Sequence, residues 1–262
     1  MSHSSSKSSV PILHIAEGIA TITLNRPAQR NRLENEDLQT LLAHFQKVNA
    51  DHAVRVVVLT ANTQGQPKPV FCAGYDIGGF DKEGQGATSF EKVPEALAVL
   101  RPITICALNG SVYGGATDIV LACDLRIGLH GLEWRMPATA IGLHYYPSGL
   151  SRYIQRMGLA ATKRAFLTAR PFTSAQLDKL GLFEDFVASE NWHACLHDLT
   201  QDVLSLAPLA TEETKKSINE IATDVAQEAT LRARVDLTSL SEDFAEGRTA
   251  FAERRKPVFR GK

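Results

Sequence analysis

Strand-like hydrophobic segments open the chain. Residues 12–15 and 19–24 carry apolar side chains on either side of the pair Glu17-Gly18, which predicts a β-hairpin. The run Val-Arg-Val-Val-Val-Leu at residues 54–59 is rich in β-branched residues and is typical of a buried strand. Three further strands are predicted by apolar runs at residues 70–74, 103–108 and 124–127.

Segments with helical spacing separate these strands. Apolar residues recur at intervals of three and four between residues 36 and 48, and the segment Glu34-Asn35-Glu36 favours a helix start. A second helix is predicted at about residues 89–100, before Arg101-Pro102, and a third at residues 116–122. Strands that alternate with helices predict an α/β fold, followed by a largely helical and charge-rich C-terminal segment.

The charge balance narrows the choice of partner. The 262 residues include 28 basic and 29 acidic side chains, so the formal net charge is −1. Because nucleic-acid-binding proteins usually carry a basic excess or patch, this balance argues against a polyanion as the main partner. Hydrophobic residues make up 44% and charged residues 22%, which is ordinary for a folded chain with a sizeable core.

The termini and cysteines bear on location. Residues 1–9 are Ser-rich, lack the apolar segment of a signal peptide and are predicted to form a disordered leader. No apolar run approaches the roughly 18 residues of a transmembrane helix. The four cysteines are scattered without a Cys-x-x-Cys pair, so we expect free thiols, no membrane partner and a cytoplasmic location.

Two glycine-bearing junctions are the strongest candidates for chemistry. One is Phe-Cys-Ala-Gly-Tyr-Asp-Ile at residues 71–77, and the other runs from a strand through Gly114-Gly115 into a helix. Glycine lets a backbone approach a ligand closely, and N–H groups at a helix start can bind developing negative charge. Two such junctions together could form an oxyanion hole, although each alone also fits ordinary turn chemistry.

Other common site patterns are missing from the sequence. His193 and His197 form an i,i+4 pair, but without a glutamate in a His-Glu-x-x-His frame a solvated pair is expected and no metal site is predicted. The sequence has neither a Gly-x-Ser-x-Gly elbow nor a Walker loop. Nothing therefore favours a serine hydrolase or a nucleotidase.

In this order and spacing, the two junctions resemble the oxyanion-hole segments of the crotonase (enoyl-CoA hydratase/isomerase) superfamily. The resemblance covers nearly the whole chain. The matching segments are Ile22 to Pro27, Phe71 to Ile77, Asn109-Gly110, Gly114 to Asp118, Cys123 to Ile127, Met136-Pro137, Gly142, Leu167 to Ala175, and the tail from Glu246 to Pro257.

The resemblance implies a ββα spiral core at residues 10–195 that binds an acyl-CoA thioester, and a helical trimerisation region at residues 196–262. It implies homotrimers or hexamers, with no cofactor beyond the coenzyme A of the substrate. The thioester oxygen would accept hydrogen bonds from two backbone N–H groups, those of Tyr75 and Gly115. Residues that would contact the substrate or its CoA moiety are Ala28, Arg30, Ala73, Asp76, Ile77, Gly114 and His144.

The acid and base positions depart from the hydratase pattern. Hydratases of the superfamily place two glutamates around the double bond, because one group must activate water while a proton is handled at the neighbouring carbon. Here Asp118 occupies the first position and Ala138, which cannot move a proton, the second. Asp118 would orient or transfer a proton, although a purely structural hydrogen bond is the alternative interpretation.

Tyr145 resembles a tyrosine of the methylmalonyl-CoA decarboxylase-like branch, which holds the substrate carboxylate while CO₂ leaves. The matching histidine of that branch is replaced here by Tyr75. Tyr145 and Tyr146 could instead pack as an aromatic loop over the acyl pocket. His144 could activate water in a hydrolytic reaction, which ranks third.

The sequence thus predicts an acyl-CoA enzyme that stabilises a thioester enolate, with a decarboxylase-like or specialised lyase reaction favoured. An enoyl-CoA hydratase/isomerase is the first alternative, and an acyl-CoA-binding protein without catalysis is the second, because of Ala138. The basic tail Arg254-Arg255-Lys256 is either solvated or close to the CoA phosphates. The acyl chain, and the choice between trimer and hexamer, stay open.

Overall fold

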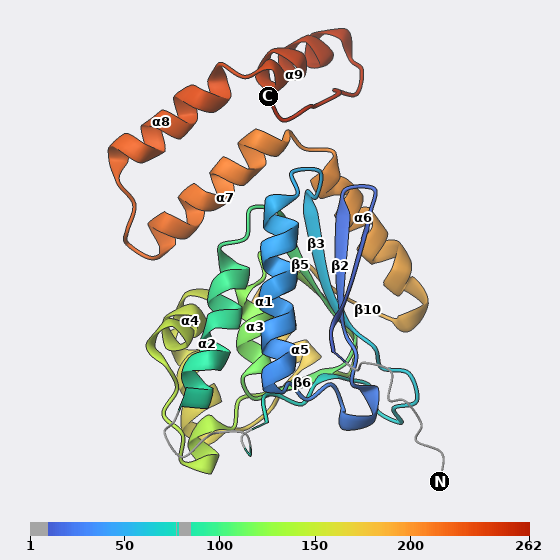
Figure 1. The fold of residues 1–262 in the computed structure, drawn as a ribbon, viewed down its shortest axis with the longest axis vertical. Helices are drawn as coiled ribbons and strands as arrows, with labels where there is room; N and C mark the ends of the chain where they lie inside the picture. The colour runs from blue at the N-terminus through green and yellow to red at the C-terminus, as the bar shows by residue number, and fades with distance from the viewer. Residues whose placement is uncertain (1–9, 77, 79–84) are drawn as a thin grey trace.

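Two sheets and a set of surrounding helices make up the chain in a computed structural model, which describes residues 10–76, 78 and 85–262 (Figure 1). The predicted leader at residues 1–9 and Ile77 lie outside the described residues. The larger sheet has the strand order β1-β2-β3-β5-β7-β10. Its strands are β1 (Ile12–Ala16), β2 (Ile19–Leu24), β3 (Val56–Ala61), β5 (Ile103–Leu108), β7 (Leu125–Leu129) and β10 (Asp185–Val187).

Strands β1 and β2 form the predicted hairpin, with Glu17 and Gly18 in the turn at φ 51° and 79°. The other neighbouring strands of this sheet are parallel. Parallel strands need crossover connections, and the predicted alternation of strands with helices supplies them. The α/β fold class is therefore confirmed.

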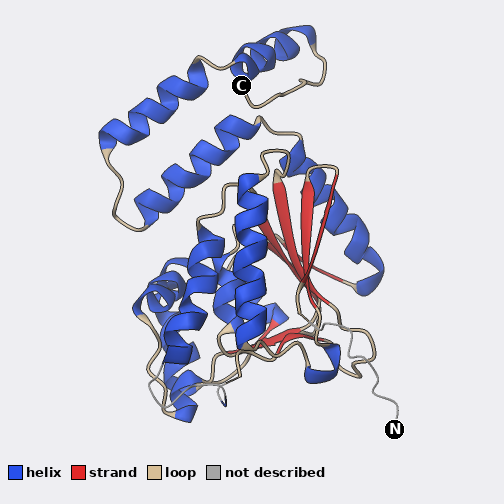
Figure 2. Ribbon diagram, in the orientation of Figure 1, coloured by secondary structure: helices blue, strands red, loops and turns tan. Residues whose placement is uncertain are grey.

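Side chains that alternate along β3 enter two different hydrophobic clusters. Val57 and Leu59 pack with residues of the first helix, whereas Val56 and Val58 pack with the helix at residues 192–204. Successive side chains of a strand point to opposite faces, so a run of β-branched residues fills both interfaces at once. Figure 2 shows the helices on both sides of this sheet.

The second sheet is small and has the order β4-β6-β8-β9. Its strands are β4 (Val70–Cys72), β6 (Ser111–Tyr113), β8 (Glu133–Arg135) and β9 (Phe172–Thr173). Of these, only β4 was predicted, because its residues belong to an apolar run, whereas β6, β8 and β9 have two or three residues of mixed polarity, too few to show a period in the sequence. This sheet matters for function, since β4 and β6 lead directly into the two glycine junctions.

The helices are α1 (Asn35–Ala50), α2 (Gln85–Ala98), α3 (Ala116–Ala122), α4 (Pro147–Thr168), α5 (Ser174–Asp178), α6 (Trp192–Leu204), α7 (Pro208–Ala222), α8 (Glu228–Ser239) and α9 (Glu242–Glu253), with 3-10 helices at η1 (Pro27–Gln29), η3 (Ala138–Ile141) and η4 (Ser189–Asn191). The predicted helices at residues 36–48, about 89–100 and 116–122 correspond to α1, α2 and α3. The start of α1 is fixed by a capping box, in which the Glu34 N–H donates to Asp37 at 2.8 Å.

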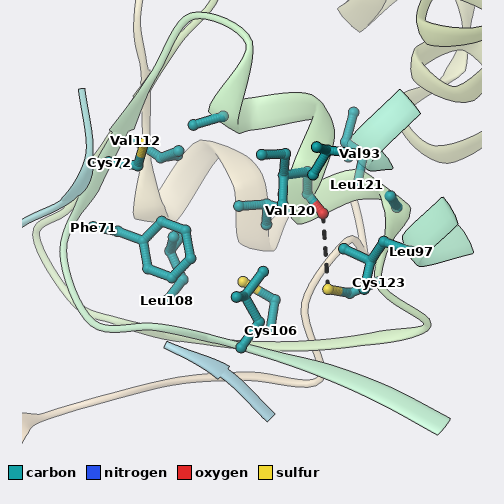
Figure 3. Close-up of a cluster of buried hydrophobic side chains, with 14 of the residues drawn as sticks. Phe71, Cys72, Val93, Leu97, Cys106, Leu108, Val112, Val120, Leu121 and Cys123 are labelled. Carbon is teal, nitrogen blue, oxygen red and sulfur yellow. Dashed lines mark hydrogen bonds between the residues drawn. The ribbon is translucent and has the colours of Figure 1, made fainter. Parts of the chain in front are cut away.

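Three of the four cysteines lie in the apolar core (Figure 3). Cys72, Cys106 and Cys123 are fully buried free thiols, as the sequence predicts. Burial raises the pKa of the Cys72 thiol to about 12, so it stays protonated and unreactive at neutral pH. These cysteines therefore act as small hydrophobic side chains.

Helices α7, α8 and α9 extend beyond one end of the larger sheet (Figure 1). Two ion pairs attach α7 to the core: Arg101 with Glu212 at 2.6 Å, and the buried Lys215 with Asp124 at 2.6 Å. The division of the chain at residue 196 remains a prediction; α6 spans that residue and packs on the sheet. Within the described residues, no helix is both long and apolar enough to cross a membrane.

Candidate active site

The two glycine junctions meet in space. Gly74 and Gly114 both have positive φ values, 99° and 58°, which favour glycine. A Cβ atom on Gly74 would lie 3.0 Å from the carbonyl oxygen of Tyr113 and 3.6 Å from the Cα of Gly114. A Cβ on Gly114 would make only an ordinary contact, 3.7 Å from the Cα of Gly74, so the close approach depends on the missing side chain of Gly74.

Backbone hydrogen bonds hold the two junction glycines in place. The Gly114 N–H donates to the Arg135 carbonyl at 2.9 Å, and the Leu33 N–H donates to the Gly74 carbonyl at 2.9 Å. Gly115, the next residue, precedes α3, and its own N–H donates to no acceptor in the part of the chain that the structure describes. Tyr75 and Gly115 therefore follow two mutually packed turns, each in a defined orientation.

A pocket of about 500 Å³ opens at these junctions. Its wall combines backbone of the two junctions with aromatic side chains from four parts of the chain: Tyr75, Phe90, Tyr113 and the pair Tyr145-Tyr146. Of the predicted site residues, those in its lining are Ala73, Tyr75, Asp76, Gly114, Gly115, His144 and Tyr145. The other described ones lie outside the lining: Ala28, Arg30 and Asp118. The Arg30 guanidinium nevertheless lies 5.4 Å from the ring centre of Tyr113, which is a lining residue.

Two stacked tyrosines cover one side of the pocket. The rings of Tyr145 and Tyr146 lie 4.2 Å apart, and their hydroxyl oxygens are 3.0 Å apart. Phe166 packs against Tyr145 at 5.4 Å, and Phe90 lies 6.4 Å from Tyr146. Both tyrosines line the pocket, and the stacking of their rings and the hydrogen bond between their hydroxyls hold the two side chains in place.

Asp118 lies behind these tyrosines and is fully buried. Its Oδ2 atom accepts a hydrogen bond from the Tyr146 hydroxyl at 2.5 Å and forms an ion pair with Arg152 at 2.7 Å. Its Oδ1 atom is buried without a hydrogen-bond partner among the described residues. Arg152, on α4, and Tyr146 were not predicted as site residues, because their link to Asp118 spans 34 and 28 positions of sequence.

Burial shifts the acid–base properties of this group. It raises the pKa of the Asp118 carboxyl above its ordinary value, and the nearby Arg152 and the Tyr146 hydrogen bond oppose that shift. Burial also raises the pKa of Tyr145 and of Tyr146, and the Asp118 charge adds to both shifts. Both hydroxyls therefore stay neutral throughout the physiological pH range.

The second acid position of the hydratase pattern lies in the pocket wall. Ala138 begins η3 and is 5% exposed, with its side chain in the lining. The carboxylate within the described lining belongs to Asp76, whose Oδ2 lies 3.4 Å from Arg32 and whose Oδ1 accepts from the Gly78 N–H at 3.1 Å. Both oxygens of that carboxylate are thus engaged at the pocket wall.

Two other predicted candidates lie in open positions. His144 is exposed at the edge of the pocket. In the basic tail, Arg255 is bound by Glu246 and Glu253, each at 2.6 Å. Among the described residues, no group of three histidines, cysteines or carboxylates is placed to hold a metal ion.

Comparison with known proteins agrees with this architecture. The family model described as enoyl-CoA hydratase/isomerase matches residues 14–262. Enoyl-CoA hydratase domain-containing protein 2, mitochondrial, of Mus musculus is 31% identical over 261 residues, which cover 94% of this chain and 86% of that protein. The 2,3-dehydroadipyl-CoA hydratase of Escherichia coli is 27% identical over 250 residues, covering 93% and 96%.

The fold is shared with solved structures as well. A crystal structure of enoyl-CoA hydratase from Bacillus anthracis matches with a TM-score of 0.88 at 25% identity, over 96% of this chain and 99% of that one. Fold and glycine junctions define a protein of the crotonase superfamily. The chain belongs to its enoyl-CoA hydratase/isomerase family. The resemblance seen in the sequence is confirmed.

Proposed function

We propose that the protein is an enzyme that binds an acyl-CoA thioester and stabilises its enolate with the N–H groups of Tyr75 and Gly115. The observation that carries this proposal is the packing of Gly74 against Gly114 at the mouth of a pocket of about 500 Å³. Preorganised N–H donors stabilise an oxyanion more than the neutral carbonyl, and one such donor contributes about 3–4 kcal/mol in transition-state stabilisation. The acyl group would occupy the aromatic pocket.

Within this class, a decarboxylase-like or specialised lyase reaction fits the side chains best. Loss of CO₂ from a carboxylated thioester yields the enolate directly and needs no general base. The pocket offers neutral tyrosine hydroxyls, Ala138 in place of a second acid, and a carboxylate at Asp76 whose oxygens are already engaged. Tyr145 would hold the acyl or carboxylate group, and Asp118 would orient or transfer a proton.

Hydration or isomerisation of an enoyl-CoA is the second candidate. Its support is the family itself and relatives such as the Escherichia coli 2,3-dehydroadipyl-CoA hydratase. A non-catalytic acyl-CoA-binding protein is the third, since Ala138 lacks an ionisable group.

Two substrates separate these candidates. The protein is incubated with methylmalonyl-CoA and with crotonyl-CoA, and the thioester products are followed by mass spectrometry. We expect loss of CO₂ from methylmalonyl-CoA to exceed addition of water to crotonyl-CoA. The reverse order favours a hydratase, binding of both without turnover favours a binding protein, and absence of any CoA-thioester binding rejects the proposed function.

A further inference from the structure

The directions of the hydrogen bonds around Asp118 follow from the chemistry of its partners. The ion pair with Arg152 keeps the Asp118 carboxylate ionised, so it can only accept hydrogen bonds. Tyr146 has one hydroxyl proton and must donate it to Oδ2 of Asp118, 2.5 Å away. The Tyr146 oxygen is then the acceptor for Tyr145, 3.0 Å away.

Both hydroxyl protons therefore point from the pocket toward Asp118. In this arrangement the Tyr145 oxygen keeps its lone pairs for a proton from the pocket, and to hold a substrate carboxylate its own proton would turn from Tyr146 toward the pocket. The chain of hydrogen bonds ends at the Asp118 carboxylate, which contacts the lining residue Tyr146 but is not itself among the described lining residues. Asp118 is shorter by one methylene than the glutamate of the hydratase pattern, and two tyrosines fill the distance between it and the acyl group.

The Asp118 carboxylate can accept a further hydrogen bond or a proton. Its Oδ1 atom is buried with no hydrogen-bond partner among the described residues. Burial and the unsatisfied oxygen make the anion less stable than a fully hydrogen-bonded carboxylate would be, so the ionised Asp118 accepts a proton more readily than an exposed aspartate does. The raised pKa of the Asp118 carboxyl has the same cause.

The geometry points to a proton relay in which Tyr145 and Tyr146 connect the acyl pocket to Asp118, with Arg152 as the residue that positions the carboxylate. This inference rests on the proposed function, since the relay serves the α-carbon of a bound thioester. Tyr145 is the residue that meets the substrate. Tyr146 and Asp118 act through it.

Every proton in the relay is accounted for by the substrate, the two tyrosines and Asp118. When the α C–H bond breaks, its electron pair stays on the thioester as the enolate, and the proton passes to the Tyr145 oxygen. The Tyr145 proton moves to Tyr146, and the Tyr146 proton moves to Oδ2 of Asp118. In the reverse direction, the proton returns from Oδ2 of Asp118 through Tyr146 and Tyr145 to the α-carbon, which restores the C–H bond and the ionised carboxylate.

Deuterium uptake at the α-carbon of butyryl-CoA in D₂O tests the relay directly, because this saturated thioester can enolise but can neither hydrate nor decarboxylate. Wild-type protein is compared with Tyr146→Phe, Tyr145→Phe and Asp118→Asn. The Asn variant keeps an acceptor for the Tyr146 hydroxyl but cannot take up the proton. Binding of butyryl-CoA is measured in parallel by calorimetry.

Tyr153→Phe is the matched control. Tyr153 belongs to the same aromatic cluster, with its ring 6.3 Å from that of Tyr145, but its hydroxyl contacts Thr117 and is not part of the relay. This variant loses one buried hydroxyl, as the Tyr146 variant does. We expect its exchange rate to stay within threefold of the wild-type rate.

The three relay variants should exchange about 100-fold more slowly than wild type, the lower end of the general acid–base contribution, with butyryl-CoA affinity changed less than about threefold. Wild-type exchange in Tyr146→Phe or in Asp118→Asn would overturn the relay. So would a wild-type protein that binds butyryl-CoA without exchange. Absence of binding by wild type would instead reject the proposed function.

Discussion

At the scale of single residues, the ion pair between Asp118 and Arg152 affects both the stability of the fold and the geometry of the candidate active site. Asp118 is fully buried and the Arg152 side chain is 11% exposed, so their charges are removed from water together. Such a pair gives little net stability relative to apolar groups, but removal of one partner leaves an uncompensated buried charge. The pair therefore fixes the position of the Asp118 carboxylate, and the stability of the fold depends strongly on Arg152.

Arg152→Met should lower the free energy of unfolding by about 3–5 kcal/mol at neutral pH, as measured by urea denaturation. Burial already raises the pKa of Asp118, and loss of Arg152 removes a group that opposes this shift. Because the folded variant then holds its proton more tightly than the unfolded chain, its relative stability improves as pH falls through the raised pKa. The destabilisation should therefore shrink toward acidic pH.

The double variant Arg152→Met/Asp118→Asn provides the control, since it removes both charges. It should be more stable than Arg152→Met alone at neutral pH and show little of the pH dependence. Equal stability of the single and double variants would mean that Asp118 carries no buried charge.

A comparison of Gly74 with Gly65 separates two costs of an added side chain: backbone strain, and close approach to another part of the backbone. Gly74 and Gly65 have similar positive φ values, 99° and 77°, but only a Cβ on Gly74 would meet another backbone, at 3.0 Å from the Tyr113 oxygen. Gly65→Ala should cost about 1–2 kcal/mol from strain alone. Gly74→Ala should cost a further 1–3 kcal/mol, by the usual range for overpacking, and weaken acyl-CoA binding.

Thermal unfolding and calorimetric titration with an acyl-CoA measure these two effects. The Gly65 variant should bind as wild type does, because its loop lies outside the pocket lining. Unchanged acyl-CoA affinity in a folded Gly74→Ala protein would show that the contact between the two junctions does not shape the site.

At the scale of elements, the sequence predicts best what depends on local periodicity. The hairpin β1–β2 and helix α1 each show their pattern within about 16 residues of chain, and both were predicted. The contacts that assemble the site depend instead on tertiary packing. The Tyr146–Asp118 bond joins the start of α4 to α3 across 28 positions, and no local pattern encodes how those helices pack.

The short helix η3 offers a gain-of-function prediction. It begins at Ala138, which lies in the pocket wall where the hydratase pattern has an acid. Ala138→Glu should increase hydration of crotonyl-CoA at least tenfold, because a carboxylate there can activate water, for which general base catalysis contributes about 100-fold or more. Product formation is followed by mass spectrometry.

Ala140→Glu is the appropriate comparison, because Ala140 belongs to the same helix but is exposed. It adds the same charge to η3 outside the pocket lining and should leave hydration at the wild-type level. If both variants hydrate crotonyl-CoA equally, or if neither gains activity while Ala138→Glu remains folded, the assignment of the second acid position is wrong.

At the scale of the whole molecule, the C-terminal helices leave large apolar side chains uncovered. Ile218 on α7 is 58% exposed, Val235 on α8 is 63% exposed and Phe251 on α9 is 87% exposed. The end of the chain is nevertheless held in place, since the N–H groups of Arg260 and Gly261 donate to the buried Asp243 at 2.6 and 2.8 Å. Large exposed apolar side chains on three successive helices indicate an interaction surface.

We expect this surface to join copies of the chain, in agreement with the trimer or hexamer predicted from the sequence. Light scattering after size-exclusion chromatography should give a wild-type mass of at least three chains. The double variant Ile218→Asp/Phe251→Asp should shift the mass toward one chain, because burial of a charge opposes association by several kcal/mol.

Val99→Asp, which changes a 76% exposed residue just after α2, should keep the wild-type mass. A wild-type protein with the mass of one chain would reject this role for the helices, and the pocket would then have to bind acyl-CoA with residues of a single subunit.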